Sequence, residues 1–276
     1  MVPIHRLPRV IAMHEEQGAH PRNHRRISRR TFVKVGMSVA AAPILSRCGN
    51  STGPIGSPSL SARPGIPSES PTLGLSSLGL SGGRDGVLYV PQSYSPDTPM
   101  PLYMPLHGAG GEGASWVNYY ARAEARGMIL LAPDSRGVTW DLVYGGFGPD
   151  VEFLDRALAY TFARCRVDPA RIALGGFSDG ASYALSLGVC NGDLFTNLIA
   201  YSPGFYAPGT PIIGTPRVFV SHGTEDTVLS VTKTRNTIVP TLRNAGYDVT
   251  YREFTGTHSV PADVGEASLD WFLGTG

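Results

Sequence analysis

Short apolar runs alternate with amphipathic segments from about residue 100 to the end of the chain. The runs are too short for buried helices and are typical of strands inside a parallel sheet. The segments between them have helical spacing, as in residues 150–165, where Val151, Leu154, Leu158 and Phe162 share one stripe. This alternation predicts an α/β domain whose mostly parallel sheet carries helices on both faces. The predicted strands are residues 102–106, 128–132, 172–175, 198–202 and 218–221, and the predicted helices are residues 116–126, 150–165, 181–189, 230–245 and 261–273.

The segment before this region has the pattern of a hairpin. Residues 73–80 alternate loosely, residues 81–86 are turn formers, and residues 87–90 resume as a strand. This arrangement predicts an antiparallel start to the sheet. One domain, residues 72–276, then accounts for every predicted element.

Two segments precede that domain. Residues 49–71 are rich in Gly, Ser and Pro and poor in large apolar side chains, which predicts a flexible tether. Residues 1–48 hold nine Lys or Arg and two Glu, and include the run Ser28-Arg29-Arg30-Thr31-Phe32-Val33-Lys34 before a moderately apolar stretch, residues 35–45. That stretch is too short to remain as a membrane-spanning helix, which favours a cleaved signal.

The Ser28–Lys34 run resembles a bacterial twin-arginine export signal, with Val33 in place of the usual leucine. The resemblance implies the twin-arginine export machinery as a partner and a periplasmic or extracellular location. Leu45-Ser46-Arg47-Cys48 is similar to a lipoprotein cleavage site except at Arg47, so membrane attachment is expected only if Cys48 carries lipid. A basic disordered arm that binds acidic partners is the alternative.

The formal net charge of +1 hides an asymmetry between the leader and the domain. After residue 48 the chain has 14 basic and 20 acidic residues, and this acidic balance argues against nucleic acid as a partner. Cys165 and Cys190 end two predicted helices and could pair in an exported protein. No His/Cys cluster has metal-ligand spacing, so we expect no metal and no other cofactor.

The sequence Gly176-Phe177-Ser178-Asp179-Gly180 lies between a predicted strand and a predicted helix. In that context G-x-S-x-G predicts a nucleophile elbow, a tight turn that requires small residues on both sides of the serine. Ser178 is therefore the candidate nucleophile.

A serine hydroxyl needs a base and an acid that orients the base. Of the three histidines outside the leader, His258 lies in a loop between the last strand and the last helix and is the candidate base, whereas His107 is expected to be structural. The acid is expected after the strand at 218–221, where both Glu225 and Asp226 are present. Asp248 is an outside candidate because it belongs more naturally to a turn before the last strand.

The residues Ser221–Val228 resemble the H-G-x-x-D loop of α/β-hydrolases, which implies Asp226 as the acid and leaves Glu225 in solvent. Stabilisation of the oxyanion requires two N–H donors, and the first is expected from Asp179, the residue after the nucleophile. The loop Leu106–Gly111 resembles the H-G-x-G loop of esterases. That resemblance implies Ala109 as the second donor and Gly110 as the next choice.

These motifs occur in a specific order. Together, L-H-G-A-G-G, A-P-D-S-R-G, D-P-A-R-I-A-L-G-G-F-S-D-G, S-H-G-T-E-D and G-T-H resemble α/β-hydrolase serine esterases of the phospholipase/carboxylesterase and polyhydroxybutyrate-depolymerase-like groups, over most of residues 84–276. The resemblance implies an α/β-hydrolase fold and hydrolysis of a small-molecule ester through an acyl-enzyme. Asp179 departs from the pattern where the carboxylesterase group often has Gln, and Ala181 departs where a further Gly is common.

Other functions use some of the same residues. A serine peptidase or an acyltransferase shares the triad, and no separate domain that would gate peptides is present, which favours esters. The loop Gly108–Gly113 also fits G-x-G-x-x-G, with Asp134 ending the next strand, as in a dinucleotide-binding unit. That alternative leaves the spacing of the three triad candidates as a coincidence.

The substrate pocket is expected in loops at the carboxyl ends of the strands. Trp116, Trp140, Tyr144 and Phe147 lie in such segments and either line the pocket or pack beneath a long loop. Little sequence is inserted between the strands to form a lid. We therefore expect an open site that accepts short or soluble esters.

Overall fold

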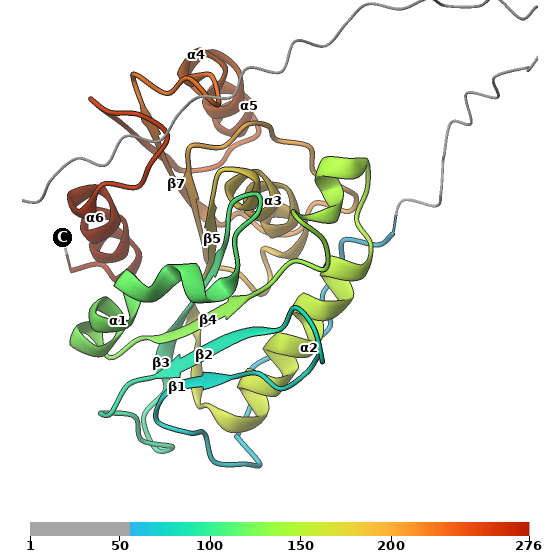
Figure 1. Cartoon of the computed structure of the whole chain (residues 1–276), viewed down its shortest axis with the longest axis vertical. Coiled ribbons are helices and arrows are strands. Elements are labelled where there is room, and N and C mark those ends of the chain that lie inside the picture. The colour runs from blue at the N-terminus through green and yellow to red at the C-terminus, as the bar shows by residue number, and fades with distance from the viewer. Residues whose placement is uncertain (1–55, 276) are drawn as a thin grey trace, which may run out of the picture. The chain divides into compact units, whose positions relative to one another are not determined.

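A computed structural model describes residues 56–275, and the sheet is the centre of this part of the chain. Its order is β1-β2-β4-β3-β5-β6-β7-β8 (Figure 1). β1 and β2 are antiparallel to their neighbours, and β3 to β8 run parallel, so the predicted hairpin and parallel sheet are both present. The strands are β1 Gly74–Ser77, β2 Gly86–Val90, β3 Met100–Leu106, β4 Ile129–Pro133, β5 Val167–Phe177, β6 Asn197–Tyr201, β7 Arg217–Gly223 and β8 Val249–Phe254.

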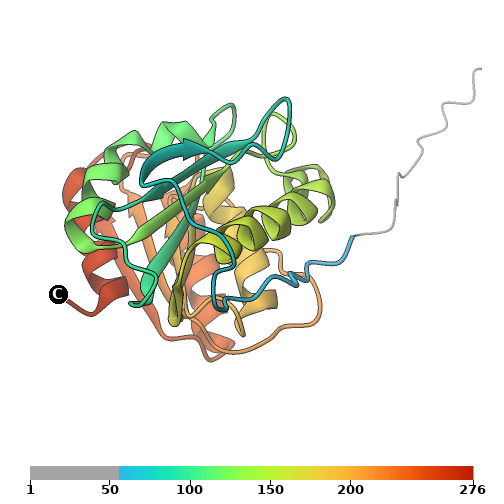
Figure 2. The ribbon, with the colours of Figure 1, turned by 90° about the horizontal axis from the view of Figure 1, so that it is seen from below.

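Helices cover both faces of the sheet (Figures 1 and 2). One core cluster joins the sheet to α2, α3 and α5, and the other joins it to α1 and α6. Successive side chains of a strand point to opposite faces, and β3 therefore contributes Met104 to the first cluster and Tyr103 to the second. The helical segments are η1 Gly113–Tyr119, α1 Tyr120–Arg126, η2 Asp141–Tyr144, α2 Pro149–Arg164, α3 Asp179–Gly188, η3 Val189–Asn191, α4 Val231–Lys233, η4 Thr234–Ile238, α5 Val239–Asn244 and α6 Ala262–Leu273.

The predicted helix at residues 230–245 is not one regular helix. It consists of α4, a π-helical segment η4 and then α5, with Pro240 in the first turn of α5. Proline has no N–H to donate and its ring crowds the preceding turn, so the regular hydrogen-bond ladder is interrupted there. Periodicity predicted the helix, and a single residue in its middle changed the geometry.

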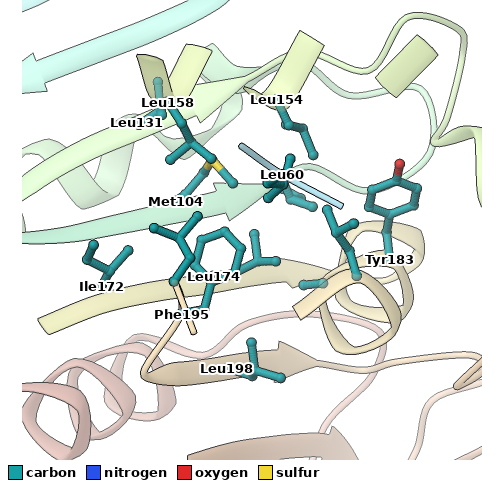
Figure 3. Packing of buried hydrophobic residues seen from close by; sticks show 14 of the residues in the cluster. Leu60, Met104, Leu131, Leu154, Leu158, Ile172, Leu174, Tyr183, Phe195 and Leu198 are labelled. Carbon is teal, nitrogen blue, oxygen red and sulfur yellow. The ribbon is translucent and has the colours of Figure 1, made fainter. Parts of the chain in front are cut away.

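The N-terminal strap, defined here as residues 56–71, packs on the domain and is not a free tether. Leu60 is buried in the main core cluster, near Leu154 and Tyr183 (Figure 3). Its N–H donates to Asn191 Oδ1 at 2.8 Å, and the N–H of Ala62 donates to Asp155 Oδ1 at 2.8 Å. The prediction of a flexible tether is therefore wrong for this segment, because side chains far along the chain bind its backbone. Residues 49–55 and the predicted export signal at 1–48, with Cys48, lie outside the described residues.

Cys165 and Cys190 are buried free thiols, so the possible disulfide is not formed. In the part of the chain that the structure describes, no helix combines the length and apolar character needed to cross a bilayer. Within the same residues, no group of His, Cys, Asp and Glu side chains is arranged to hold a metal ion.

Candidate active site

Ser178 lies at a sharp turn between the end of β5 and the start of α3. Its backbone has φ 58° and ψ −120°, a strained conformation for a residue with a side chain. A Cβ on Gly176 would lie 2.4 Å from the carbonyl carbon of Gly180, and a Cβ on Gly180 would lie 2.4 Å from the oxygen of Leu106. The two glycines are therefore sterically required, as expected for a nucleophile elbow.

The structure brings Ser178, His258 and Asp226 together from the carboxyl ends of three strands. His258 Nε2 lies 2.9 Å from Ser178 Oγ, and His258 Nδ1 lies 2.6 Å from Asp226 Oδ2. Ser178 follows β5, Asp226 follows β7 and His258 follows β8, so residues 80 positions apart meet at one edge of the sheet. With the ring proton on Nδ1, the imidazole donates to the carboxylate and its Nε2 can accept the serine proton.

The Asp226 side chain is fully buried and well supplied with donors. Its Oδ1 accepts the N–H groups of Val228 at 2.8 Å and Leu229 at 2.9 Å. Burial alone raises the pKa of this carboxyl, but the hydrogen bonds from His258 and the two backbone N–H groups outweigh burial and lower the pKa below its usual value. Asp226 is therefore held as a carboxylate beside the imidazole.

The other candidate acids lie elsewhere. Glu225 is exposed to solvent, and Asp248 forms a surface contact of 3.4 Å with Arg217. Neither side chain is hydrogen-bonded to His258 among the described residues. The geometry thus agrees with the choice of Asp226 made from the loop motif.

A second imidazole contacts Asp226, and sequence reasoning missed it. His222 Nε2 lies 3.1 Å from Asp226 Oδ2 and 3.0 Å from the oxygen of Leu229, while Nδ1 lies 2.9 Å from Thr234 Oγ1. Burial lowers the pKa of His222, so it stays neutral and donates from Nε2. The signal was the spacing of four residues in H-G-x-x-D, which folds the histidine back onto the aspartate.

The loop after β3 supplies the candidate oxyanion donors. A Cβ on Gly108 would lie 3.3 Å from Ser178 Cβ, which places this loop against the nucleophile. Gly110 is not a donor, because its N–H is already bonded to the oxygen of Val138 at 2.8 Å. Ala109 N–H has no acceptor among the described residues, and Asp179 N–H opens α3, where no intrahelical acceptor exists.

The Asp179 carboxylate is bound by a neighbouring loop. Thr139 Oγ1 donates to Asp179 Oδ2 at 2.8 Å. The loop that carries Thr139 is fixed by the half-buried Asp141 and the buried Asp150, since Asp141 N donates to Asp150 Oδ2 at 2.6 Å and Asp150 N donates to Asp141 Oδ2 at 2.9 Å. Burial raises the pKa of Asp150 to about 6.

His107 fixes the oxyanion loop rather than acting on substrate. Its Nδ1 donates to the oxygen of Gly108 at 2.7 Å, and its Nε2 accepts the N–H of Ser135 at 3.0 Å. Burial lowers its pKa, in agreement with a neutral ring. The expectation that His107 is structural matches these contacts.

A groove with a volume of about 840 Å³ lies beside His258 and Ala109. Of the four aromatic residues expected in the pocket, Trp116 lines this groove and the other three do not. This cavity is called the groove from here on. The residues that line it are His107, Gly108, Ala109, Gly111, Ser115, Trp116, Asn118, Tyr119, Arg122, Phe177, His258, Ser259, Val260 and Ala262.

The other three aromatic residues have different roles. Trp140 is fully buried and donates its indole N–H to the oxygen of His107 at 2.8 Å. Phe147 packs edge-on against Tyr183, with ring centroids 5.7 Å apart. Tyr144 is 71% exposed and does not line the groove. These three side chains do not line the groove, because strand-end position does not determine where a loop side chain points, and the packing of Trp140 and Phe147 matches the alternative that the sequence left open.

The glycine-rich loop is used for packing rather than for phosphate binding. A Cβ on Gly113 would lie 1.9 Å from the oxygen of Ala132. The Asp134 carboxylate, which a dinucleotide site would need for a ribose, accepts the N–H groups of Gly113 at 2.6 Å and Asp85 at 2.9 Å. These contacts disfavour the dinucleotide alternative.

Comparisons with known proteins agree with this geometry. No family model matches the chain. The chain is 34% identical over 114 residues to feruloyl esterase C of Emericella nidulans, a match that covers 38% of this chain and 41% of the relative. Esterase PE8 has a TM-score of 0.58 at 23% identity, covering 70% of this chain and 99% of that chain. Acetyl xylan esterase from Aspergillus awamori has a TM-score of 0.57 at 18% identity, covering 73% and 99%.

The chain has the α/β-hydrolase fold, and esterases are among its structural neighbours, as the motifs predicted. The relative with the higher sequence identity is also an ester-hydrolysing enzyme by name, although the chain matches less than half of its length.

Proposed function

We propose that this protein is a serine carboxylic-ester hydrolase with Ser178, His258 and Asp226 as its triad. The observation that carries the proposal is the unbroken hydrogen-bonded series from Ser178 Oγ through His258 to Asp226 Oδ2, with distances of 2.9 and 2.6 Å. It begins at a strained elbow whose geometry exposes a serine to an incoming carbonyl.

In the acylation step, His258 Nε2 accepts the proton of Ser178 while Oγ attacks the ester carbonyl carbon. Negative charge then develops on the carbonyl oxygen, and the N–H groups of Ala109 and Asp179 stabilise it. The imidazolium is stabilised by the Asp226 carboxylate. When the tetrahedral intermediate collapses, the C–O bond breaks and the alcohol leaves with the proton from Nε2.

Deacylation repeats the same proton transfers with water. His258 removes a proton from the water molecule as its oxygen attacks the acyl carbon, and the proton on Nε2 then returns to Ser178 Oγ as the acid leaves. The His107 ring is neutral, and the Asp179 carboxylate is hydrogen-bonded to Thr139 rather than to Ser178 or His258.

The groove suits an ester with a compact acid or alcohol group. Its walls come from η1, α1 and the segment before α6, and residues 56–275 insert no long lid over it. The names feruloyl esterase and acetyl xylan esterase describe enzymes that act on small acyl esters. We take short or soluble esters as the substrate class of this chain.

We also propose that residues 1–48 direct export through the twin-arginine machinery, so that the enzyme acts in the periplasm or outside the cell. The Ser28–Lys34 motif supports this proposal. Fractionation of cells producing the full chain would test it, since activity retained in the cytoplasm would contradict export.

The first experiment is hydrolysis of p-nitrophenyl esters from acetate to palmitate by wild type and Ser178→Ala. We expect turnover by wild type, highest on short chains, and a loss of about 10⁴-fold or more in kcat for the variant. A fluorophosphonate reagent should add its mass to wild type and not to the variant. Turnover that survives in Ser178→Ala would exclude Ser178 as the nucleophile. Labelling without turnover on any ester would redirect the proposal to a peptidase or an acyltransferase.

A further inference from the structure

The groove has aromatic walls and one permanent positive charge. Trp116 and Tyr119 pack edge to face with ring centroids 4.9 Å apart, and the Phe177 ring lies 4.6 Å from that of His258. Arg122 also lines the groove, whereas no Asp or Glu of the described residues does. A groove of this kind favours a flat apolar group that carries negative charge.

The Arg122 guanidinium is partly buried and only partly engaged. It lies 4.6 Å from the centre of the Tyr119 ring, and its Nε is paired with Glu266 Oε1 at 2.7 Å. Its side chain is 15% exposed, and within the described part of the chain Glu266 is its one ion-pair partner. The two Nη groups have no protein acceptor among the same residues, so they remain available as donors to a ligand.

The surroundings leave room for Arg122, and its one ionic partner among the described residues is shared with a second arginine. A Cβ on Gly265 would lie 2.5 Å from Arg122 Nη1, so this glycine makes the guanidinium's position possible. Glu266 is shared, because its Oε2 also binds Arg126 Nη2 at 2.6 Å. Figures 1 and 2 show α1 and α6 side by side, and Ala262, the first residue of α6, lines the groove. The positive end of that helix adds to the field of Arg122.

We propose that the groove binds a flat aromatic group of the ester substrate that bears a carboxylate, and that Arg122 recognises this carboxylate. The substrates would be monoesters of aromatic dicarboxylic acids, with the ring between Trp116 and Phe177 and the carboxylate on the free guanidinium N–H groups. Arginine binds carboxylates through two parallel N–H donors, which gives both affinity and orientation. This inference rests on the proposed esterase function and specifies its substrate.

The test compares two esters of the same shape, methyl 4-carboxybenzoate and methyl 4-acetylbenzoate. The acetyl group activates its ester more than the carboxylate does, so intrinsic reactivity opposes the preference that we predict. We expect wild type to have a kcat/KM about tenfold or more higher for the carboxylate ester, the discrimination typical of a charge-assisted hydrogen bond. In Arg122→Gln this ratio should fall to about one or below.

The matched control is Arg126→Gln. Arg126 lies on the same helix and contacts the same Glu266, but it does not line the groove, so its loss should leave the ratio unchanged. An equal loss of the ratio in both variants would show that the preference depends on the ion-pair cluster and not on contact between Arg122 and the substrate, which contradicts the proposal. A wild-type ratio near one, or a ratio that survives Arg122→Gln, would overturn the proposal.

A binding measurement separates failure of this inference from failure of the esterase function. Calorimetric titration of Ser178→Ala with methyl 4-carboxybenzoate needs no turnover, and Ser178→Ala with Arg122→Gln is its comparison. Binding that is at least tenfold tighter with Arg122 supports the groove assignment even if wild type hydrolyses neither ester. Equal binding, or none, by the two proteins contradicts it even if wild type is an active esterase on neutral substrates.

Discussion

The carboxyl edge of the sheet and the N-terminal strap are stabilised by similar contacts but have different consequences. At the sheet edge, Asp226 is buried and its oxygens bind His258, His222 and two backbone N–H groups. At the strap, the buried Asn191 amide binds the backbone of residues 58 and 60. Both are buried polar side chains that fix a loop by hydrogen bonds. One network holds groups that react, and the other holds a segment of chain in place.

The difference teaches that burial and full hydrogen bonding do not by themselves identify a functional site. What distinguishes the sheet edge is that Ser178 has a strained backbone and its Oγ lies 2.9 Å from His258, which lines the groove, whereas Asn191 is buried in the interior. Changes at the sheet edge should therefore cost activity, and changes at the strap should cost stability.

The largest expected effect is that of Asp226→Asn. The amide cannot hold the His258 Nδ1–H in the same way or stabilise the imidazolium, and kcat should fall by roughly 10³–10⁴-fold. The thermal midpoint should change little in comparison. Glu225→Gln, the neighbouring exposed acid, is the control and should retain wild-type kcat in the p-nitrophenyl acetate assay. Comparable losses in the two variants would reverse the assignment of the acid.

Leu60→Ala tests whether the strap contributes to stability rather than to activity. Removal of this buried side chain from the strap should lower the free energy of unfolding by about 2–3 kcal/mol, measured by urea denaturation. The kcat of the folded fraction should stay at the wild-type value. Ile66→Ala is the control, because Ile66 belongs to the same strap but is 84% exposed. If Leu60→Ala matched Ile66→Ala in stability, the strap would contribute nothing to folding.

A substitution at Asp150 tests the role of α2, the helix that also carries Asp155, whose carboxylate binds the backbone of the strap. Burial raises the pKa of Asp150 to about 6, so the folded state binds this proton more tightly than the unfolded chain does. The stabilisation is complete at acid pH and is lost as pH rises from about 4 to about 6.

We expect the free energy of unfolding of wild type to fall by about 1–2 kcal/mol over this pH range because of Asp150, and that of Asp150→Asn not to show this fall. Urea denaturation at intervals between pH 4 and pH 7 measures the difference between the two proteins. Asp97→Asn, in an exposed loop, is the control for a general effect of charge. A difference between wild type and Asp150→Asn that does not vary with pH would contradict the assignment.

The predictable features are those that depend on neighbours in the sequence. The elbow at Ser178 requires glycines two residues away on each side, and the H-G-x-x-D loop encodes Asp226 within one turn. The features that were missed depend on distant partners. Gly110 was the second choice for an oxyanion donor, but its N–H is bonded to the Val138 oxygen. The strap was expected to be flexible from its composition, but Asn191, which lies 131 positions after Leu60, binds its backbone.

The buried thiols make the domain convenient for chemical labelling. Burial raises the pKa of Cys165 to about 12 and also raises that of Cys190, and the thiolate is the form that reacts with alkylating reagents. Both native cysteines of residues 56–275 should therefore resist such reagents while the domain is folded. A cysteine introduced at a chosen surface position of these residues would accept a dye or a solid support by itself, and a serine-directed reagent would mark Ser178 independently.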